Sequence, residues 1–206
     1  PSIEPPADAP IDPPAPSAAP MLNGWNEDGG RRYYYEQGKR KTGWAQIDGS
    51  WYYLGTDGAM QSDKWVSSGG QWFHLSADGT MSTGWTEVGN AWYFLNADGV
   101  MQSNTWIDSG GRWFYLGDSG AMLTSAWLSQ GGSWYYLGAD GSMATGWTQI
   151  EGAWYYLGGD GAMTTGWTRV GGSWYYFGAN GVMQHGTWIS SGGQWFHLDD
   201  SGAMTT

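Results

Sequence analysis

The chain has 206 residues with 36 Gly, 17 Trp and 13 Tyr, no Cys, and a formal net charge of −11. Without Cys it forms no disulfides and no thiolate metal sites, and it contains no run of about 20 apolar residues that would span a membrane. From Thr42 onward 13 acidic residues stand against three basic ones. This balance disfavours nucleic acid as a partner, because phosphate binding needs a basic groove.

Residues 1–20 contain all eight Pro of the chain and no aromatic residue. This composition favours extended polyproline-II conformations and does not build a core, so we predict a semi-rigid linker. The chain starts at Pro1 without a signal peptide, and we therefore expect a mature fragment with something attached before the linker.

Residues 21–43 predict a degenerate capping repeat, since terminal repeats are atypical. Trp25 keeps its place, and Tyr33 to Tyr35 replace a Trp-Tyr-Tyr sequence after a turn one residue longer. Arg40 takes the place of a Met, and five of the eight basic residues lie in this segment. Capping is the first explanation of these charges, and contact with an anion is the second.

Residues 44–206 contain eight copies of a unit of 20 or 21 residues, a period typical of a solenoid. The first Trp of each copy is Trp44, Trp65, Trp85, Trp106, Trp127, Trp147, Trp167 or Trp188. The second follows seven residues later, at Trp51, Trp72, Trp92, Trp113, Trp134, Trp154, Trp174 and Trp195. A Met closes each copy: Met60, Met81, Met101, Met122, Met143, Met163, Met183 and Met204.

Between the two Trp of each copy lies a pair such as Asp48-Gly49 or Gly131-Gly132 that suits a two-residue hairpin turn. Glu151-Gly152 is the weakest of these pairs. A turn there places Trp147 opposite Tyr156 and Ile150 opposite Ala153. Because side chains alternate along a strand, Trp147, Trp154 and Tyr156 share one face, and Thr148, Ile150, Tyr155 and Leu157 share the other.

The face that bears Leu157 is the predicted core. Its last position is Leu in seven of the eight copies and Phe177 in the copy that begins at Trp167. Its two first-strand positions exchange volume, since a small residue at one accompanies a large residue at the other, as close packing requires. The Trp pairs are thereby assigned to the outside of an all-β solenoid of stacked hairpins.

The pattern GW-x₆-WYYL-x₃-G-x-M-x-T-GW resembles the choline-binding, or cell-wall-binding, repeat of Gram-positive surface proteins and phage lysins. The resemblance covers residues 21–206. It implies a secreted or cell-surface module that attaches a linked domain to phosphocholine on wall teichoic or lipoteichoic acid, and it leaves a homodimer open. In that family an aromatic cage between successive hairpins takes two Trp from one unit, an aromatic residue from the next, and often a Met.

Carried onto this sequence, the family pattern predicts cages with a Tyr as the third wall. They combine Trp85 and Trp92 with Tyr115, Trp106 and Trp113 with Tyr136, Trp127 and Trp134 with Tyr156, and Trp147 and Trp154 with Tyr176. The third wall becomes His74 for Trp44 and Trp51, Phe94 for Trp65 and Trp72, and His197 for Trp167 and Trp174. Met101, Met122, Met143 and Met163 are the expected soft closures. A protonated His would repel a cation, so the two His-walled cages are expected to be weak or empty.

Independently of the family, aromatic cages suit quaternary ammonium groups through cation–π contacts. One alternative is that the aromatic residues form a structural ladder that holds the hairpins together. Another is that the module binds a glucan, whose sugar rings would stack on the Trp pairs. The acidic residues recur with the period, so no acid/base pair stands out as catalytic. The three His stand in separate repeats and do not predict a metal site, and no cofactor is expected.

Overall fold

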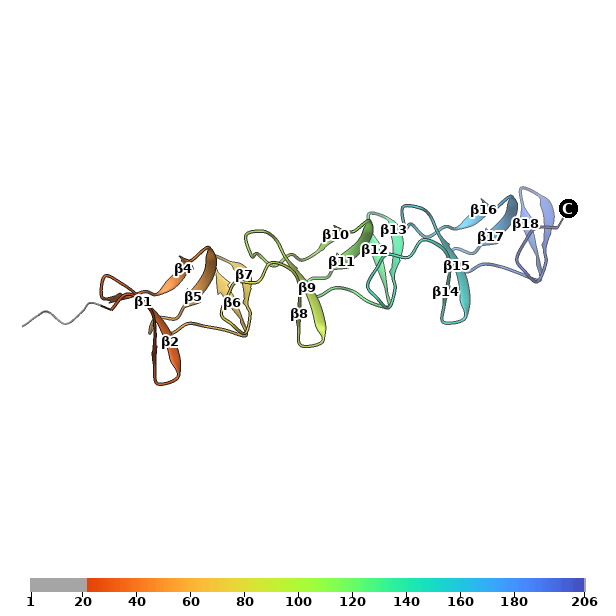
Figure 1. The fold of residues 1–206 in the computed structure, drawn as a ribbon. Coiled ribbons are helices and arrows are strands. Elements are labelled where there is room, and N and C mark those ends of the chain that lie inside the picture. The colour runs from red at the N-terminus through yellow and green to blue at the C-terminus, as the bar shows by residue number, and fades with distance from the viewer. Residues whose placement is uncertain (1–21, 206) are drawn as a thin grey trace, which may run out of the picture. The chain divides into compact units, whose positions relative to one another are not determined.

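The computed structural model describes residues 22–205, and every regular element among them is a β-strand (Figure 1). The predicted linker, residues 1–20, lies outside the described residues. The strands are β1 (Gly24–Asp28), β2 (Arg31–Glu36), β3 (Lys39–Arg40), β4 (Gly43–Ile47), β5 (Ser50–Leu54), β6 (Lys64–Ser68), β7 (Gln71–Leu75), β8 (Gly84–Val88), β9 (Ala91–Leu95), β10 (Thr105–Ser109), β11 (Arg112–Leu116), β12 (Ala126–Gln130), β13 (Ser133–Leu137), β14 (Gly146–Ile150), β15 (Ala153–Leu157), β16 (Gly166–Val170), β17 (Ser173–Phe177), β18 (Thr187–Ser191) and β19 (Gln194–Leu198).

The strands form two-stranded antiparallel hairpins, apart from β1, β2 and β3, which share one sheet. In β14 and β15, Trp147 pairs with Tyr156 and Ile150 with Ala153, so the predicted register is confirmed. Their turn holds Glu151 and Gly152 at φ of 50° and 86°. A two-residue turn with positive φ at both positions matches the twist of the two strands. The hairpin therefore imposes this conformation on Glu151, although a Glu adopts positive φ less readily than Gly or Asn.

The chain divides into two compact units. The first contains the described residues up to Val66 together with His74–Met81, and the second contains Ser67–Phe73 and the residues from Ser82 onward. Within the second unit the β8–β9 and β14–β15 hairpins project to the same side, and so do β10–β11 and β16–β17 (Figure 1). The direction of the hairpins therefore recurs at every third one, as in a solenoid.

The core of each unit is a column of one apolar residue per hairpin. Its members have no exposed surface: Leu54 and Leu75 in the first unit, and Leu95, Leu116, Leu137, Leu157, Phe177 and Leu198 in the second. This column occupies the predicted core position. A buried Leu contributes about 1.5–3 kcal/mol relative to an exposed one, so the repeated column is a main source of stability.

The connection after each hairpin reaches back to the hairpin before it. The Met183 amide donates a hydrogen bond of 2.8 Å to the Trp154 carbonyl, and the Met163 amide does the same to Trp134. The turn before Met183 contains Gly181 at φ 77°, where a Cβ would overlap the sulfur of Met163. Glycine is thus required there by close approach as well as by φ.

The first hairpin is more regular than the sequence suggested. Trp25 pairs with Tyr34, and Arg32 lies seven residues after Trp25, as the second Trp does in later copies. The predicted longer turn is therefore wrong, because the Tyr residues follow the second-Trp position instead of beginning at it. Arg40 does occupy the Met position, since its side chain packs at Gly58 as Met60 packs at Gly79.

Candidate ligand-binding grooves

Four grooves follow one another in the second unit, with volumes of about 270–340 Å³. Each is lined by both Trp of one hairpin, an aromatic residue of the next hairpin, and the Met that closes that next unit. The lining residues are Trp106, Trp113, Tyr135, Met143, Gly159 and Asp160; Trp127, Trp134, Tyr155, Met163, Ala179 and Asn180; Trp147, Trp154, Tyr175, Met183 and Ser201; and Trp167, Trp174, Ser191, Phe196 and Met204.

The groove at Trp147 shows how the hairpins build this arrangement. Trp147 on β14 and Trp154 on β15 have ring centroids 6.3 Å apart with planes at 85°. Tyr175 on β17 packs against Trp147 at 4.8 Å and 74°. The Met183 backbone hydrogen bond to Trp154 holds the thioether of the next unit at the same groove. The rings therefore stand around a small volume at steep angles instead of forming a flat stack.

The Trp walls remain open to solvent. Trp147 is 37% exposed and Trp154 is 41% exposed, whereas the core column beneath them is fully buried. The predicted outward direction is confirmed for the second Trp, which is exposed in all eight copies, whereas the first Trp is half-buried in six of them. Because aromatic surface on this scale is costly to leave in water, the exposed row of second Trp residues indicates a binding face.

The predicted third walls are corrected by one residue. The structure brings Tyr175, Tyr155 and Tyr135 into the grooves where the sequence analysis placed Tyr176, Tyr156 and Tyr136. Each expected Tyr instead packs on the first Trp of its own hairpin: Tyr176 on Trp167 at 5.2 Å, Tyr156 on Trp147 at 5.3 Å, Tyr136 on Trp127 at 5.2 Å and Tyr115 on Trp106 at 5.1 Å.

The reason for this shift lies in the stacking. Tyr155 belongs to the face assigned to the core, but that face of one hairpin meets the Trp-bearing side of the hairpin before it. The ring of Tyr155 accordingly lies 5.0 Å from that of Trp127. In the same way Phe114, not Tyr115, lies 5.3 Å from Trp85, and the Met122 amide donates to the Trp92 carbonyl at 2.8 Å.

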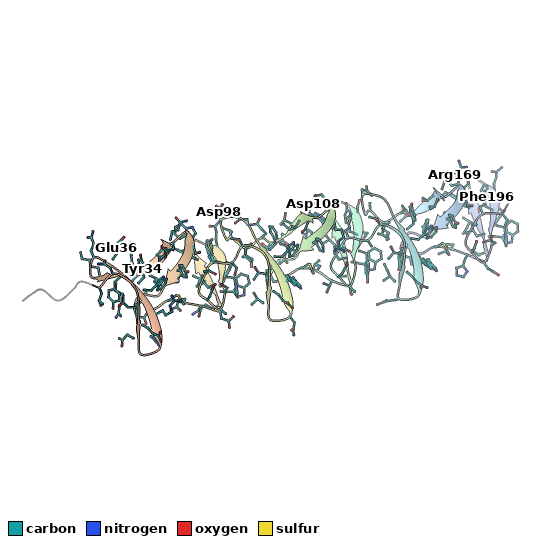
Figure 2. All side chains as sticks on the ribbon, in the orientation of Figure 1. Tyr34, Glu36, Asp98, Asp108, Arg169 and Phe196 are labelled. Atoms are coloured by element: carbon teal, nitrogen blue, oxygen red, sulfur yellow. The ribbon has the colours of Figure 1, made fainter. Side chains whose placement is uncertain are left out.

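The residues expected as substitute walls are also placed on their own hairpins. His197 packs on Trp188 at 4.9 Å, while the groove of Trp167 and Trp174 is completed by Phe196, which is labelled in Figure 2. His74 lies 5.1 Å from Trp65, and Phe94 lies 5.3 Å from Trp85. Burial lowers the pKa of His74, so its imidazole is neutral at neutral pH.

The remaining predicted residues keep the same local geometry. Trp44 packs on Tyr53 of its own hairpin at 5.2 Å, and the Trp51 backbone carbonyl accepts a hydrogen bond of 2.8 Å from the Met81 amide. The Trp72 carbonyl accepts one of 2.8 Å from the Met101 amide. Trp51 and Trp72 are 41% and 48% exposed, which matches the accessible second Trp of the later hairpins.

Sequence reasoning missed Tyr135, Tyr155, Tyr175, Phe196, Met183 and Met204 as groove residues. A signal for the aromatic wall was present, because the residue directly after the second Trp is Tyr or Phe in all eight copies. The position after it, which was chosen, includes His74 and His197. A wall that closes on a neighbouring hairpin tolerates less variation than a ring that covers its own.

The rims of the grooves differ in charge. Asp160 lies at the rim of the Trp106 groove, Asn180 takes the matching place at Trp127, and Ser201 does so at Trp147. Ser201 donates a hydrogen bond of 2.6 Å to Asp199, which lowers the pKa of that carboxyl. In the first unit the Ser76 hydroxyl similarly helps to lower the pKa of Asp78 to about 2. The carboxylates of Asp199 and Asp78 are therefore negatively charged at neutral pH.

The described residues also bear on metal binding and membrane insertion. Within residues 22–205 no group of three or more His, Asp or Glu side chains is placed to hold a metal ion. The same residues include no helix that is long and apolar enough to cross a membrane.

The fold and grooves define a class: a β-solenoid of hairpins with aromatic-lined grooves between successive repeats. Models of the choline-binding repeat match residues 82–127, 129–165 and 164–206, and models of the putative cell wall binding repeat match 42–60 and 63–81. No curated protein sequence matches the chain.

Solved structures agree with the repeat models. The choline-binding domain of CbpL from Streptococcus pneumoniae is similar, with 32% identity, a TM-score of 0.66, and coverage of 80% of this chain and 87% of that one. Choline binding protein F from the same organism has 29% identity and a TM-score of 0.60 over 89% and 87% of the two chains. The modular autolysin LytC of S. pneumoniae has 25% identity and a TM-score of 0.55, and the match spans 88% of this chain but 48% of LytC.

The chain therefore belongs to the choline-binding repeat family. Membership makes it a choline-binding module for attachment to the cell wall, and such repeat domains are binding modules.

Proposed function

We propose that each groove with a Trp pair binds the trimethylammonium group of one choline. The observation that carries this proposal is the repeated set of two Trp, one Tyr or Phe, and one Met around a volume of about 270–340 Å³. A cation over an aromatic face gains about 0.5–2 kcal/mol, and a quaternary ammonium has no N–H groups that need hydrogen-bond partners. Three ring faces around one small space suit such a cation.

The proposed ligand contacts follow from the lining of the grooves. Trp147 and Trp154 supply two walls, Tyr175 the third, and Met183 a soft closure. The Trp127, Trp106 and Trp167 grooves repeat this set with Tyr155, Tyr135 and Phe196. We extend the assignment to Trp85 and Trp92 with Phe114, and to the pair Trp44 and Trp51.

Charge supports a cationic ligand. The net charge of the whole chain is −11, and Asp160 lies at the rim of one groove. A summed negative field raises the local concentration of cations and disfavours polyanions that lack a cationic group. The grooves are also apolar inside, so the ammonium methyl groups lose water on binding while the charge remains close to the aromatic faces.

A neutral glucan fits this geometry less well. Sugar rings stack flat on an exposed aromatic ring, whereas the Trp147 groove has ring planes at 85° and 74° to one another. Steep angles leave room for a compact, roughly spherical group. The geometry therefore favours choline over glucan as the ligand.

Several grooves on one chain suit a polymer that carries many copies of the ligand. One groove should bind weakly, because a few cation–π contacts must offset desolvation and the lost freedom of the ligand. A dissociation constant of about 1 mM corresponds to a binding free energy of only about −4.1 kcal/mol. Once one groove is occupied, binding at the next is intramolecular, and avidity exceeds a single affinity by roughly 10² to 10⁴. The proposed partner is phosphocholine on wall teichoic or lipoteichoic acid.

In this proposal the module is secreted, lies at the cell surface and holds a linked domain there. The relative LytC is a modular autolysin, and this chain matches about half of it. The acidic residues of the described chain recur with the repeats, mostly in turns, and form no unique pair, so the module itself is proposed to be non-catalytic.

The first prediction tests the ligand and the grooves together. Free choline should raise the melting temperature and elute the chain from a choline-like matrix, because it binds the stacked state and not the unfolded chain. Trp147→Ala with Trp154→Ala should remove one choline per chain in equilibrium dialysis and weaken retention partly, since neighbouring grooves remain.

A matched control comes from the turn of the same hairpin. Glu151 is exposed there and lines none of the four grooves. Glu151→Asn keeps a residue that tolerates positive φ and should leave the choline count unchanged. If millimolar choline changes neither melting nor retention while a neutral glucan changes both, the proposal is wrong.

A further inference from the structure

The first hairpin contains an incomplete copy of the groove. Trp25 pairs with Tyr34 as Trp147 pairs with Tyr156, and Arg32 pairs with Glu27 as Trp154 pairs with Gln149. Arg32 thus occupies the position that holds Trp in all eight later copies. Tyr34, which covers Trp25 within its own hairpin, is labelled in Figure 2.

The other members of the groove are in place. Tyr52 of the next hairpin lies 5.0 Å from Trp25 with ring planes at 71°, close to the 4.8 Å and 74° between Tyr175 and Trp147. The Met60 amide donates a hydrogen bond of 2.8 Å to the Arg32 carbonyl, as Met183 does to Trp154. Trp25, Tyr52 and Met60 all pack against the same core cluster. The backbone and three of the four lining positions are therefore those of a ligand-binding groove.

The side chain of Arg32 brings a cation to this groove. Its Cζ lies 4.6 Å from the centroid of the Trp25 ring, which is within cation–π distance. The adjacent Arg31 instead forms an ion pair of 2.9 Å with Asp57. Among the described residues Arg32 forms no ion pair, although Glu27 is its cross-strand neighbour. The guanidinium is always charged, weakly hydrated and planar, so it stacks well on an aromatic ring.

We infer that Arg32 is a built-in ligand that fills the cation position of the first groove, so that this groove does not take up choline. The inference rests on the proposed function of the later grooves. A tethered cation is present at an effective concentration of roughly millimolar or above, and a weakly binding free cation competes poorly with it. Position 32, and its equivalent in each hairpin, therefore decides whether a groove binds an external cation or one from the chain.

The test follows the indole N–H signal of Trp25 by NMR during titration with choline chloride. In the wild-type chain this signal should not shift at choline concentrations that shift the signals of Trp147 and Trp154. Arg32→Ala vacates the groove, and the Trp25 signal should then shift, but only at several-fold higher choline because one wall is missing. Arg32→Trp should restore the wall, lower that concentration to the range of the other grooves, and add one bound choline per chain.

The matched control is Arg31→Ala, which removes an exposed cation one residue away and should leave the Trp25 signal insensitive to choline. A choline-dependent shift of Trp25 in the wild-type chain, together with the other Trp signals, overturns the inference alone. So does an Arg32→Ala chain whose Trp25 never responds, since the groove would then be incomplete instead of filled. If no Trp signal responds in the wild-type chain, the proposed function fails and the inference with it.

Discussion

The grooves at Trp106 and Trp127 have the same walls but different rims. Both combine two Trp with a Tyr and a Met, yet Asp160 borders the first and Asn180 the second. The Trp106 indole also donates a hydrogen bond of 2.6 Å to Gln130, at a position that is Ile150 in the hairpin beside Trp127. In the proposed function the shared walls define the class of ligand, and the rim adjusts how tightly each groove holds it.

The repeat explains why the rim can vary without harm to the fold. Asp160 and Asn180 each accept a hydrogen bond from the backbone amide two residues later, at 3.0 Å from Ala162 and 3.2 Å from Val182. Either side chain therefore completes the turn, since Asp and Asn share this hydrogen-bonding pattern. Only the charge presented to the groove changes.

The largest expected effect comes from removing the third aromatic wall, which is Tyr135 in the Trp106 groove and Tyr155 in the Trp127 groove. Tyr155→Leu removes the third ring from the Trp127 groove and should lower its choline affinity by about tenfold, equivalent to about 1.4 kcal/mol for one cation–π contact. The measurement is a titration that follows the indole N–H signals of Trp127 and Trp134.

Tyr156→Leu is the matched control, because it removes a neighbouring ring that packs on Trp147 instead. It should leave the affinity of the Trp127 groove within about twofold of the wild-type value. Equal losses in the two variants would mean that general loosening of the hairpin, and not loss of a wall, weakens binding. Melting temperatures measured without choline separate the two causes.

The distinction between Tyr155 and Tyr156 also shows which features of the structure can be predicted from the sequence. Period, turn pairs and alternation were enough to predict the all-β solenoid, the register of Trp147 with Tyr156 and the buried column at Leu157, because these depend on contacts within one hairpin. The third wall depends on how one hairpin meets the next. Alternation within a strand says nothing about that contact, so Tyr155 was assigned to the core.

Arg32 illustrates the same limit at the first hairpin. Its spacing from Trp25 is seven residues, but the run Tyr33 to Tyr35 looks like the Trp-Tyr-Tyr sequence shifted by one. Aromatic similarity suggested the wrong alignment, whereas backbone pairing fixes the right one. That the guanidinium lies over Trp25 depends on side-chain torsions that no periodic pattern specifies.

A smaller effect is expected from exchanging the rims. Asp160→Asn should weaken choline binding at the Trp106 groove by roughly twofold to fivefold, and Asn180→Asp should strengthen it at the Trp127 groove by a similar factor. The reason is that a carboxylate near a bound cation contributes about 1 kcal/mol or less through water. Site-resolved titration at low salt measures the choline affinity of both grooves. With both substitutions in one chain, the Trp127 groove should gain affinity relative to the Trp106 groove.

Added salt provides the control for this exchange. At about 1 M ionic strength the Debye length falls to roughly 3 Å, so both variants should approach the wild-type values. Phosphocholine should also show a smaller difference than choline, because its phosphate is repelled by the same carboxylate. A rim effect that persists in high salt would point to a changed turn instead of a charge.

The smallest expected effect concerns the hydrogen bond between the Trp106 indole and Gln130. Gln130→Ala removes the acceptor for the Trp106 indole, and because that contact is exposed, its loss should cost no more than about 0.5–1 kcal/mol. Part of this cost falls on orienting the indole, so choline affinity at this groove should drop by about twofold. Gln130→Glu keeps an acceptor and adds a carboxylate, so it should retain at least the wild-type affinity. The Trp147 groove, which includes no residue of the hairpin that carries Gln130, serves as an internal reference in the same titration. A drop that Gln130→Glu fails to rescue would show that the amide acts by filling space beside Trp106 and not by holding its N–H.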